Sequence, residues 1–284
     1  MPIDPSFLKE LDKFRIAIKR RVHSNLKGSR ESTATGEGLV FEDYVPYTPG
    51  DDIRHIDWNV FARTEKTFIK RMEEEKNSIV HIVLDASSSM NFGNNIKKFE
   101  YGAMIGLGFA YMAAKANEKF EFTVFSNKLD FIRAKAGSRG IMGLVEQLNK
   151  ADIGGKSKLK ESLLEYKKNI HSRSIVVIIS DFLYDINDIR EVLLRYKRSQ
   201  AYLVQILDPV EKNLKLSGDV ILKDLETDTS MQTYISARTR EQYRQRLQEH
   251  IMRIDDICSH LGAKFISMTT DQPVFDSFYR ILFN

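Results

Sequence analysis

The pattern of hydrophobic positions is most distinctive in the segment IVHIVLD, which covers residues 79–85. Aliphatic residues occupy positions 79, 80, 82, 83 and 84, and the run stops abruptly at Asp85. Such a run is typical of a strand that is covered on both faces, because a strand with one solvated face alternates hydrophobic and polar residues. The segment therefore predicts a central strand of a mostly parallel sheet, with Asp85 at its carboxyl end.

Strand and helix patterns alternate along the rest of the chain. Strands are predicted at residues 120–125, 175–180, 201–207 and 264–268, and helices at 98–118, 137–148, 157–170, 186–196, 238–260 and 274–282. This alternation indicates an α/β fold with a doubly wound, mostly parallel sheet. An N-terminal helix and strand extension and a β-hairpin elaboration at about 218–236 are expected in addition. We expect residues 1–75 to form an N-terminal region and residues 76–284 to form the α/β domain.

Composition and charge are those of an ordinary globular protein of 284 residues, 42% hydrophobic and 29% charged. The net charge of +4 is concentrated in the first 30 residues, where eight Lys and Arg face three Asp and Glu. No interleaving of aromatic and basic residues accompanies this charge, so we expect no nucleic-acid partner. The longest apolar run, residues 101–114, is too short to span a bilayer, and the single cysteine, Cys258, is predicted to be a buried thiol. These features favour a cytoplasmic protein without an integral membrane segment.

Candidate chemistry follows the central strand directly. Asp85, Ser87 and Ser89 form the pattern Asp-x-Ser-x-Ser, and hard oxygen donors at such spacing on a tight loop can reach one small cation. A plain polar turn is the structural alternative, since Asp and Ser are common turn residues. Two further oxygen donors are expected on the same sheet edge: Ser157, after a Gly-Gly loop, and Asp181, at the end of a second buried strand.

This constellation resembles the metal-ion-dependent adhesion site of von Willebrand factor A domains. The resemblance implies that Asp85, Ser87, Ser89, Ser157 and Asp181 bind Mg²⁺, with Mn²⁺ or Ca²⁺ as alternative ions. Ser157 stands where that family usually has Thr. Serine keeps the hydroxyl group of threonine but lacks its methyl group. One carboxylate and neutral hydroxyls leave Mg²⁺ under-neutralised, so the expected partner is a protein that offers an Asp or Glu to the metal.

Residues 39–64 contain an idiosyncratic segment with the acids Asp51, Asp52 and Asp57 around Arg54 and the only tryptophan, Trp58. A structural interpretation is sufficient for most of it, with Asp side chains capping turn amides and Arg54 pairing with a carboxylate. The order of these residues before the LDASSSM segment is similar to the bacterial "domain of unknown function 58" family, over roughly residues 36–210. Members are commonly found beside MoxR-type AAA+ ATPases, which implies an adaptor or co-chaperone that assists the maturation of a client complex. Whether the five residues contact a partner or brace the loop stays open.

The loop after residue 85 lacks the motifs of common hydrolases. A haloacid-dehalogenase-like phosphatase would need Asp at position 87, a serine hydrolase would need glycines around Ser87, and no P-loop or His/Cys zinc pattern is present. Two-metal sites generally need more carboxylates than Asp85 and Asp181 supply, although Asp208 could add a third. The expectation is a binding module and not an enzyme. A metal-dependent phosphohydrolase and a metal-free scaffold remain as alternatives.

Overall fold

A computed structural model describes residues 3–4, 6–26, 39–48, 51–74, 79–132, 138–170, 174–214, 216, 218–223 and 229–283. The chain divides into two compact units, one comprising Met1–Arg20 with Ile79–Asn284 and the other comprising Arg21–Ser78. None of the described helices combines the length and the apolar character needed to cross a lipid bilayer.

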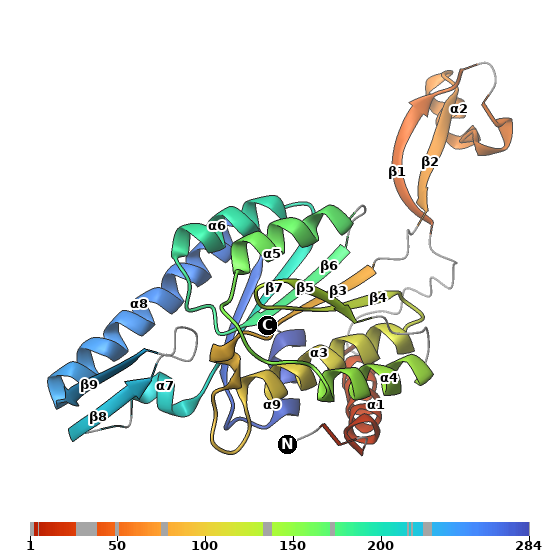
Figure 1. Cartoon of the computed structure of the whole chain (residues 1–284). Coiled ribbons are helices and arrows are strands. Elements are labelled where there is room, and N and C mark those ends of the chain that lie inside the picture. Colours follow the sequence, from red (N-terminus) through yellow and green to blue (C-terminus); the bar gives the residue numbers. More distant parts are fainter. Residues whose placement is uncertain are drawn as a thin grey trace. The chain divides into compact units, whose positions relative to one another are not determined.

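The larger unit contains a six-stranded sheet (Figure 1), whose strand order is β10-β7-β6-β3-β4-β5. The strands are β3 (Ile79–Asp85), β4 (Phe120–Phe125), β5 (Leu129–Ile132), β6 (Ser174–Ser180), β7 (Gln200–Leu207) and β10 (Lys264–Thr269). Five strands run parallel, and the edge strand β5 pairs antiparallel with β4. From β3 the chain continues to β4 on one side and later returns to β6 on the other side. The strand order therefore reverses at β3, which is where open α/β sheets form their ligand crevice.

Helices cover both faces of this sheet. They are α1 (Ser6–Leu26), α3 (Lys98–Lys115), α4 (Ser138–Asn149), α5 (Leu159–Tyr166), α6 (Ile186–Arg195), α7 (Pro209–Asn213), α8 (Ala237–Leu261) and α9 (Val274–Phe283). In Figure 1, α3, α4 and α9 lie against one face, and α5, α6 and α8 lie against the other. The doubly wound α/β fold with a mostly parallel sheet, predicted from the sequence, is confirmed.

Each face of the sheet has its own hydrophobic core, which explains the apolar run in β3. Ile82 and Leu84 belong to the cluster beneath α3, whereas Val83 belongs to the cluster beneath α5 and α6. Because successive side chains point to opposite faces, a strand between two helical layers must be apolar at nearly every position. His81 is the buried exception, and its Nδ1 lies 2.8 Å from the hydroxyl of Tyr166.

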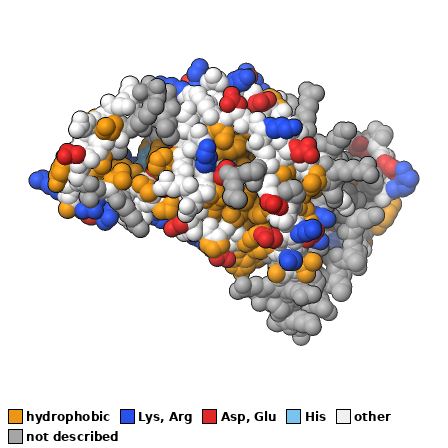
Figure 2. Space-filling model, turned by 60° about the horizontal axis from the view of Figure 1, so that its bottom comes forward, with side chains coloured by type: hydrophobic (Ala, Val, Ile, Leu, Met, Phe, Trp, Pro, Cys, Tyr) orange, Lys and Arg blue, Asp and Glu red, His pale blue; other side chains and the backbone are white. Residues whose placement is uncertain are grey.

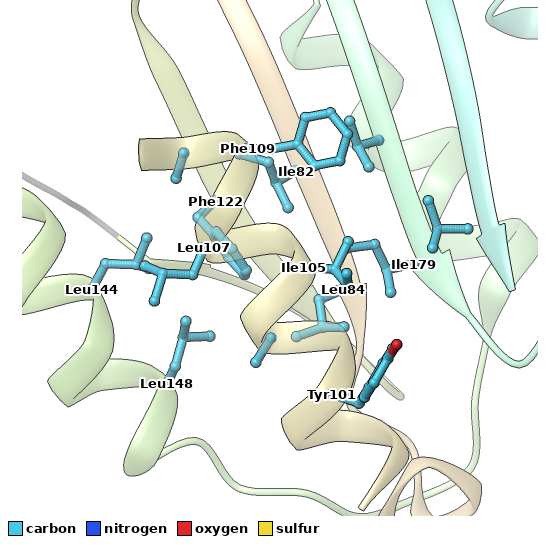
Figure 3. Packing of buried hydrophobic residues seen from close by; sticks show 14 of the residues in the cluster. Ile82, Leu84, Tyr101, Ile105, Leu107, Phe109, Phe122, Leu144, Leu148 and Ile179 are labelled. Atoms are coloured by element: carbon cyan, nitrogen blue, oxygen red, sulfur yellow. The ribbon is translucent and has the colours of Figure 1, made fainter. Parts of the chain in front are cut away.

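Helix α3 packs closely on the sheet through buried hydrophobic side chains (Figure 3). A Cβ at Gly102 would lie 2.9 Å from Leu84 Cδ1, and one at Gly106 would lie 2.9 Å from the Phe122 ring. Real Cβ atoms essentially never approach so closely. The glycines therefore allow the helix axis to approach strands β3 and β4 at the point where the candidate site begins.

The β-hairpin elaboration is also confirmed, with β8 (Gly218–Lys223) and β9 (Ser230–Ile235) pairing antiparallel. Part of its predicted turn, residues 224–228, lies outside the described residues. Ile221, Met231 and Tyr234 on this hairpin are exposed. On the face shown in Figure 2, hydrophobic side chains are interspersed with charged ones.

The smaller unit is built on an antiparallel pair, β1 (Leu39–Pro46) and β2 (Phe68–Glu74). A short 3-10 helix, η1 (Ile53–His55), and helix α2 (Trp58–Thr64) connect the two strands. The strand of the expected N-terminal extension is present, whereas α2 was not predicted. Residues 27–38, Pro49 and Gly50 lie outside the described residues.

Candidate metal centre

The loop after β3 folds back on its own aspartate. The Ser87 N–H donates to Asp85 Oδ1 at 2.9 Å, and residues Ser88–Asn91 form the 3-10 turn η2. This turn places Ser87 Oγ and Ser89 Oγ 3.1 Å apart. Asp85 and Ser87 are completely buried. The Asp-x-Ser-x-Ser spacing therefore gathers one carboxylate and two hydroxyls at the carboxyl end of the central strand.

A second loop is joined to the first by two backbone hydrogen bonds. The Gly154 N–H donates to the Ala86 carbonyl at 2.9 Å, and the Ser88 N–H donates to the Gly155 carbonyl at 3.0 Å. Gly155 has a φ of 82°, in the left-handed region that glycine adopts without strain. The Gly-Gly pair thus lets this loop run beside the first, and Ser157, two residues later, becomes part of the site.

The Asp85 carboxylate is surrounded by hydroxyl groups. Its Oδ2 atom accepts hydrogen bonds from Ser180 at 2.7 Å and from Tyr184 at 2.5 Å, and Ser157 Oγ lies 3.5 Å away. The Tyr184 hydroxyl also lies 2.5 Å from Ser157 Oγ. Burial raises the pKa of Asp85, and repulsion from Asp181 raises it further, whereas the hydrogen bonds act in the opposite direction. A bound cation would favour the ionised form of this desolvated carboxylate.

Asp181 lies close enough to Asp85 to affect its ionisation, but it has a cationic partner of its own. Lys98 Nζ donates to Asp181 Oδ2 at 2.9 Å and to Glu211 Oε1 at 2.7 Å. The Lys98 side chain is completely buried. Burial alone would lower the pKa of Lys98, but its two carboxylate partners outweigh that effect and leave the pKa raised. The lysine therefore carries its charge inside the protein.

The donor set fits a small, hard cation. Asp85, Ser87, Ser89 and Ser157 bring one carboxylate and three hydroxyl oxygens together, and such ligands suit Mg²⁺, Mn²⁺ or Ca²⁺. Across the described ranges of the chain, no three His, Cys, Asp or Glu side chains are grouped as metal ligands. Asp181 differs from the other four residues because its carboxylate is already paired with an ammonium group.

Sequence comparison connects this site to a family. A family model described as "Protein of unknown function DUF58" matches residues 43–253, which is most of the chain. The chain belongs to this family. An uncharacterized protein of Mycobacterium tuberculosis, Rv1480, is 23% identical over 274 residues, covering 95% of this chain and 86% of the relative.

Two solved structures resemble this DUF58 protein more distantly. The conserved hypothetical protein BatB from Bacteroides thetaiotaomicron is 11% identical with a TM-score of 0.45, covering 72% of this chain and 97% of BatB. The SpRpn10 VWA domain is 14% identical with a TM-score of 0.44, covering 72% of this chain and 94% of that domain.

The family-specific residues of the smaller unit serve its local structure. Asp52 accepts from the Arg54 backbone N–H and pairs with its guanidinium, with Arg54 Nη2 at 2.7 Å from Asp52 Oδ2. Asp57 caps α2, and Asp51 accepts hydrogen bonds within the preceding turn. These contacts agree with the structural interpretation. Trp58 differs because its side chain remains 63% exposed, so packing within the unit does not explain its size.

Four contributors to the site were not predicted from the sequence: Lys98, Ser180, Tyr184 and Glu211. Ser180 carried a usable signal, because it directly precedes Asp181 at the end of β6. Lys98 stands at the start of a helix, where lysine is ordinarily solvated. Tyr184 lies in the short loop after β6, and Glu211 lies in the short helix α7 after β7; local sequence patterns do not define the paths of these segments.

Proposed function

We propose that this DUF58 protein captures an acidic protein partner through Mg²⁺ held by Asp85, Ser87, Ser89 and Ser157, with Asp181 close by. The observation that carries the proposal is the convergence of one buried carboxylate with neutral hydroxyls at the reversal point of the sheet. A single carboxylate leaves a divalent ion under-neutralised, and Mg²⁺ readily keeps exchangeable positions in its coordination shell. An Asp or Glu of a partner protein is suited to take such a position.

The family supports a more specific role. DUF58 proteins are commonly found beside MoxR-type AAA+ ATPases, and we extend the proposal to an adaptor or co-chaperone that presents a client complex to such an ATPase. In this role the metal-bound partner is the client or the ATPase itself. The von Willebrand A-like arrangement agrees with an interaction module of this kind.

The direct test is a comparison of Asp85→Asn with the wild-type protein. Titration calorimetry should show Mg²⁺ binding by the wild type and its loss in Asp85→Asn, because an amide supplies no negative charge. Asp188→Asn is the matched control, since Asp188 lies on α6 in an exposed ion pair with Lys160. Its Mg²⁺ affinity should equal that of the wild type. Equal affinity in Asp85→Asn would overturn the proposed site.

Partner capture is tested separately with a purified MoxR-type ATPase. A pull-down in Mg²⁺ should retain the ATPase or its client, and chelation by EDTA or the Asp85→Asn change should release it. Retention that survives both treatments would indicate a metal-free scaffold. Release of phosphate from a panel of esters, lost in Asp85→Asn, would instead support the phosphohydrolase alternative.

A further inference from the structure

Lys98 occupies a fixed position between two carboxylates at the edge of the candidate metal site. It is the first residue of α3, its backbone N–H donates to the Phe92 carbonyl at 2.9 Å, and its side chain is completely buried. Gly102, one turn further along α3, fixes the helix against the sheet through the close approach to Leu84. The ammonium group is therefore part of the framework of the site and not a mobile surface charge.

Glu211 is held just as firmly. Its Oε2 atom accepts from the Asp208 backbone N–H at 2.9 Å, completing a capping box at the start of α7. Its Oε1 atom remains for Lys98 Nζ at 2.7 Å. Lys98 thus connects Asp181, which follows β6, with Glu211, which follows β7. The carboxyl ends of two neighbouring strands share one buried cation.

The fixed positive charge of Lys98 changes the electrostatic potential at the candidate metal site. Lys98 supplies one positive charge that pairs with the carboxylates of both Asp181 and Glu211. This pairing leaves Asp85 as the ligand carboxylate that offsets the charge of the metal, so a divalent ion would stay under-neutralised. Without Lys98 the same ion would be over-neutralised by the protein, and an additional carboxylate from a partner would be less attracted to it.

We infer that Lys98 is a positioning residue that serves as an internal counter-ion for Asp181, weakening metal binding while keeping the bound metal attractive to an external carboxylate. This inference rests on the proposed function and specifies its charge requirement. The class of ligand it favours is a carboxylate group, such as the side chain of Asp or Glu.

The test measures Mg²⁺ affinity by calorimetry in three variants of the full chain. Lys98→Met should bind Mg²⁺ more tightly, by roughly tenfold, because it removes a positive charge close to the ion. Glu211→Gln should bind it more weakly, because it removes a negative charge and leaves Lys98 to Asp181 alone. Lys160→Met is the matched control, because Lys160 also joins two carboxylates, Asp188 and Glu191, while its side chain is 33% exposed. Its loss should leave the Mg²⁺ affinity unchanged.

Acetate, a simple carboxylate, supplies the second readout. With Mn²⁺ in the site, acetate should displace metal-bound water, which lowers the water-proton relaxation rate. The wild type should show this change at a lower acetate concentration than Lys98→Met. Lys98→Arg keeps the charge and should behave like the wild type. This outcome would separate a charge effect from loss of packing.

The outcomes distinguish the inference from the proposed function. If the wild type shows no Asp85-dependent Mg²⁺ binding, the proposed function is overturned. If the wild type binds Mg²⁺ and Lys98→Met binds it equally or more weakly, the counter-ion role is wrong and the proposed function stands. If Lys98→Met does not fold, Glu211→Gln decides, since unchanged or tighter Mg²⁺ binding in that variant would overturn the inference.

Discussion

Replacing Gly102 by alanine tests how closely α3 must approach the sheet to form the site. The added Cβ would lie 2.9 Å from Leu84 Cδ1, 3.0 Å from Ile179 Cγ2 and 3.1 Å from Ile206 Cδ1. All three side chains are completely buried and come from three neighbouring strands, so none can move aside into solvent. Leu84 and Ile179 directly precede Asp85 and Ser180, which carries the disturbance into the candidate metal centre.

Two opposing free-energy terms decide the result. Alanine stabilises a helix interior by about 0.8–1.0 kcal/mol relative to glycine, whereas overpacking a core costs about 1–3 kcal/mol. We expect Gly102→Ala to lower the free energy of unfolding by about 1 kcal/mol. Gly143→Ala on α4 is the matched control, because a Cβ there would meet nothing within 4 Å. It should raise the free energy of unfolding by up to about 1 kcal/mol.

Urea denaturation followed by circular dichroism measures both changes, and the difference between the two variants isolates the packing term. That difference should be about 1–3 kcal/mol, with a lower melting temperature for Gly102→Ala. Mg²⁺ affinity should fall in Gly102→Ala and stay constant in Gly143→Ala. If both alanines stabilise the protein equally, close approach of α3 to the strands is not what requires the glycine.

Three further predictions follow from buried titratable groups. Burial lowers the pKa of His81 below 6.5 despite the opposing attraction of Glu121. The stability that neutral His81 contributes is therefore present above pH 6.5 and is lost as the pH falls below 6.5. Between pH 7.5 and pH 5, His81→Asn should lose less unfolding free energy than the wild type, and equal losses would contradict this. Burial raises the pKa of Cys258 to about 12, so a thiol reagent at pH 8 should react only on unfolding, and rapid labelling of the native protein would show the cysteine to be accessible. Tyr184→Phe removes a hydrogen bond that favours ionised Asp85. Calorimetry at a series of pH values should therefore show that this variant begins to bind Mg²⁺ at a higher pH than the wild type does. An unchanged pH midpoint of Mg²⁺ binding would refute that role of the hydroxyl.

The sequence was sufficient for the fold because its signals are local. The apolar run of β3 and the Gly262 C-cap, with its φ of 72°, each depend on neighbouring residues. Ser87, Ser157 and Asp181 could be placed on one edge because parallel strands end at the same side of a sheet. Lys98 and Tyr184 could not be assigned to the site from the sequence. Lys98 pairs with Asp181, 83 residues away, and Tyr184 pairs with Asp85, 99 residues away. Helix α2 was missed because its seven residues are too few to show a helical period in the sequence.

The network around Asp85 also bears on the choice between capture and catalysis. A hydrolase needs a group that accepts or donates a proton near the reacting atoms, with a pKa suited to the operating pH. Burial raises the pKa of Tyr184, and the neighbouring Asp85 and Asp181 raise it further, so the phenol keeps its proton. Lys98 stays charged between two carboxylates.

Glu211 is another titratable group of this network. Burial raises the pKa of Glu211, but one of its oxygens accepts from a backbone N–H and the other from Lys98. Moving a proton to it would break an ion pair inside the protein, which is costly when the remaining charge is buried. Binding an external carboxylate at a metal requires no such proton transfer. Under the proposed function, these groups keep their protonation states while the metal binds an external carboxylate.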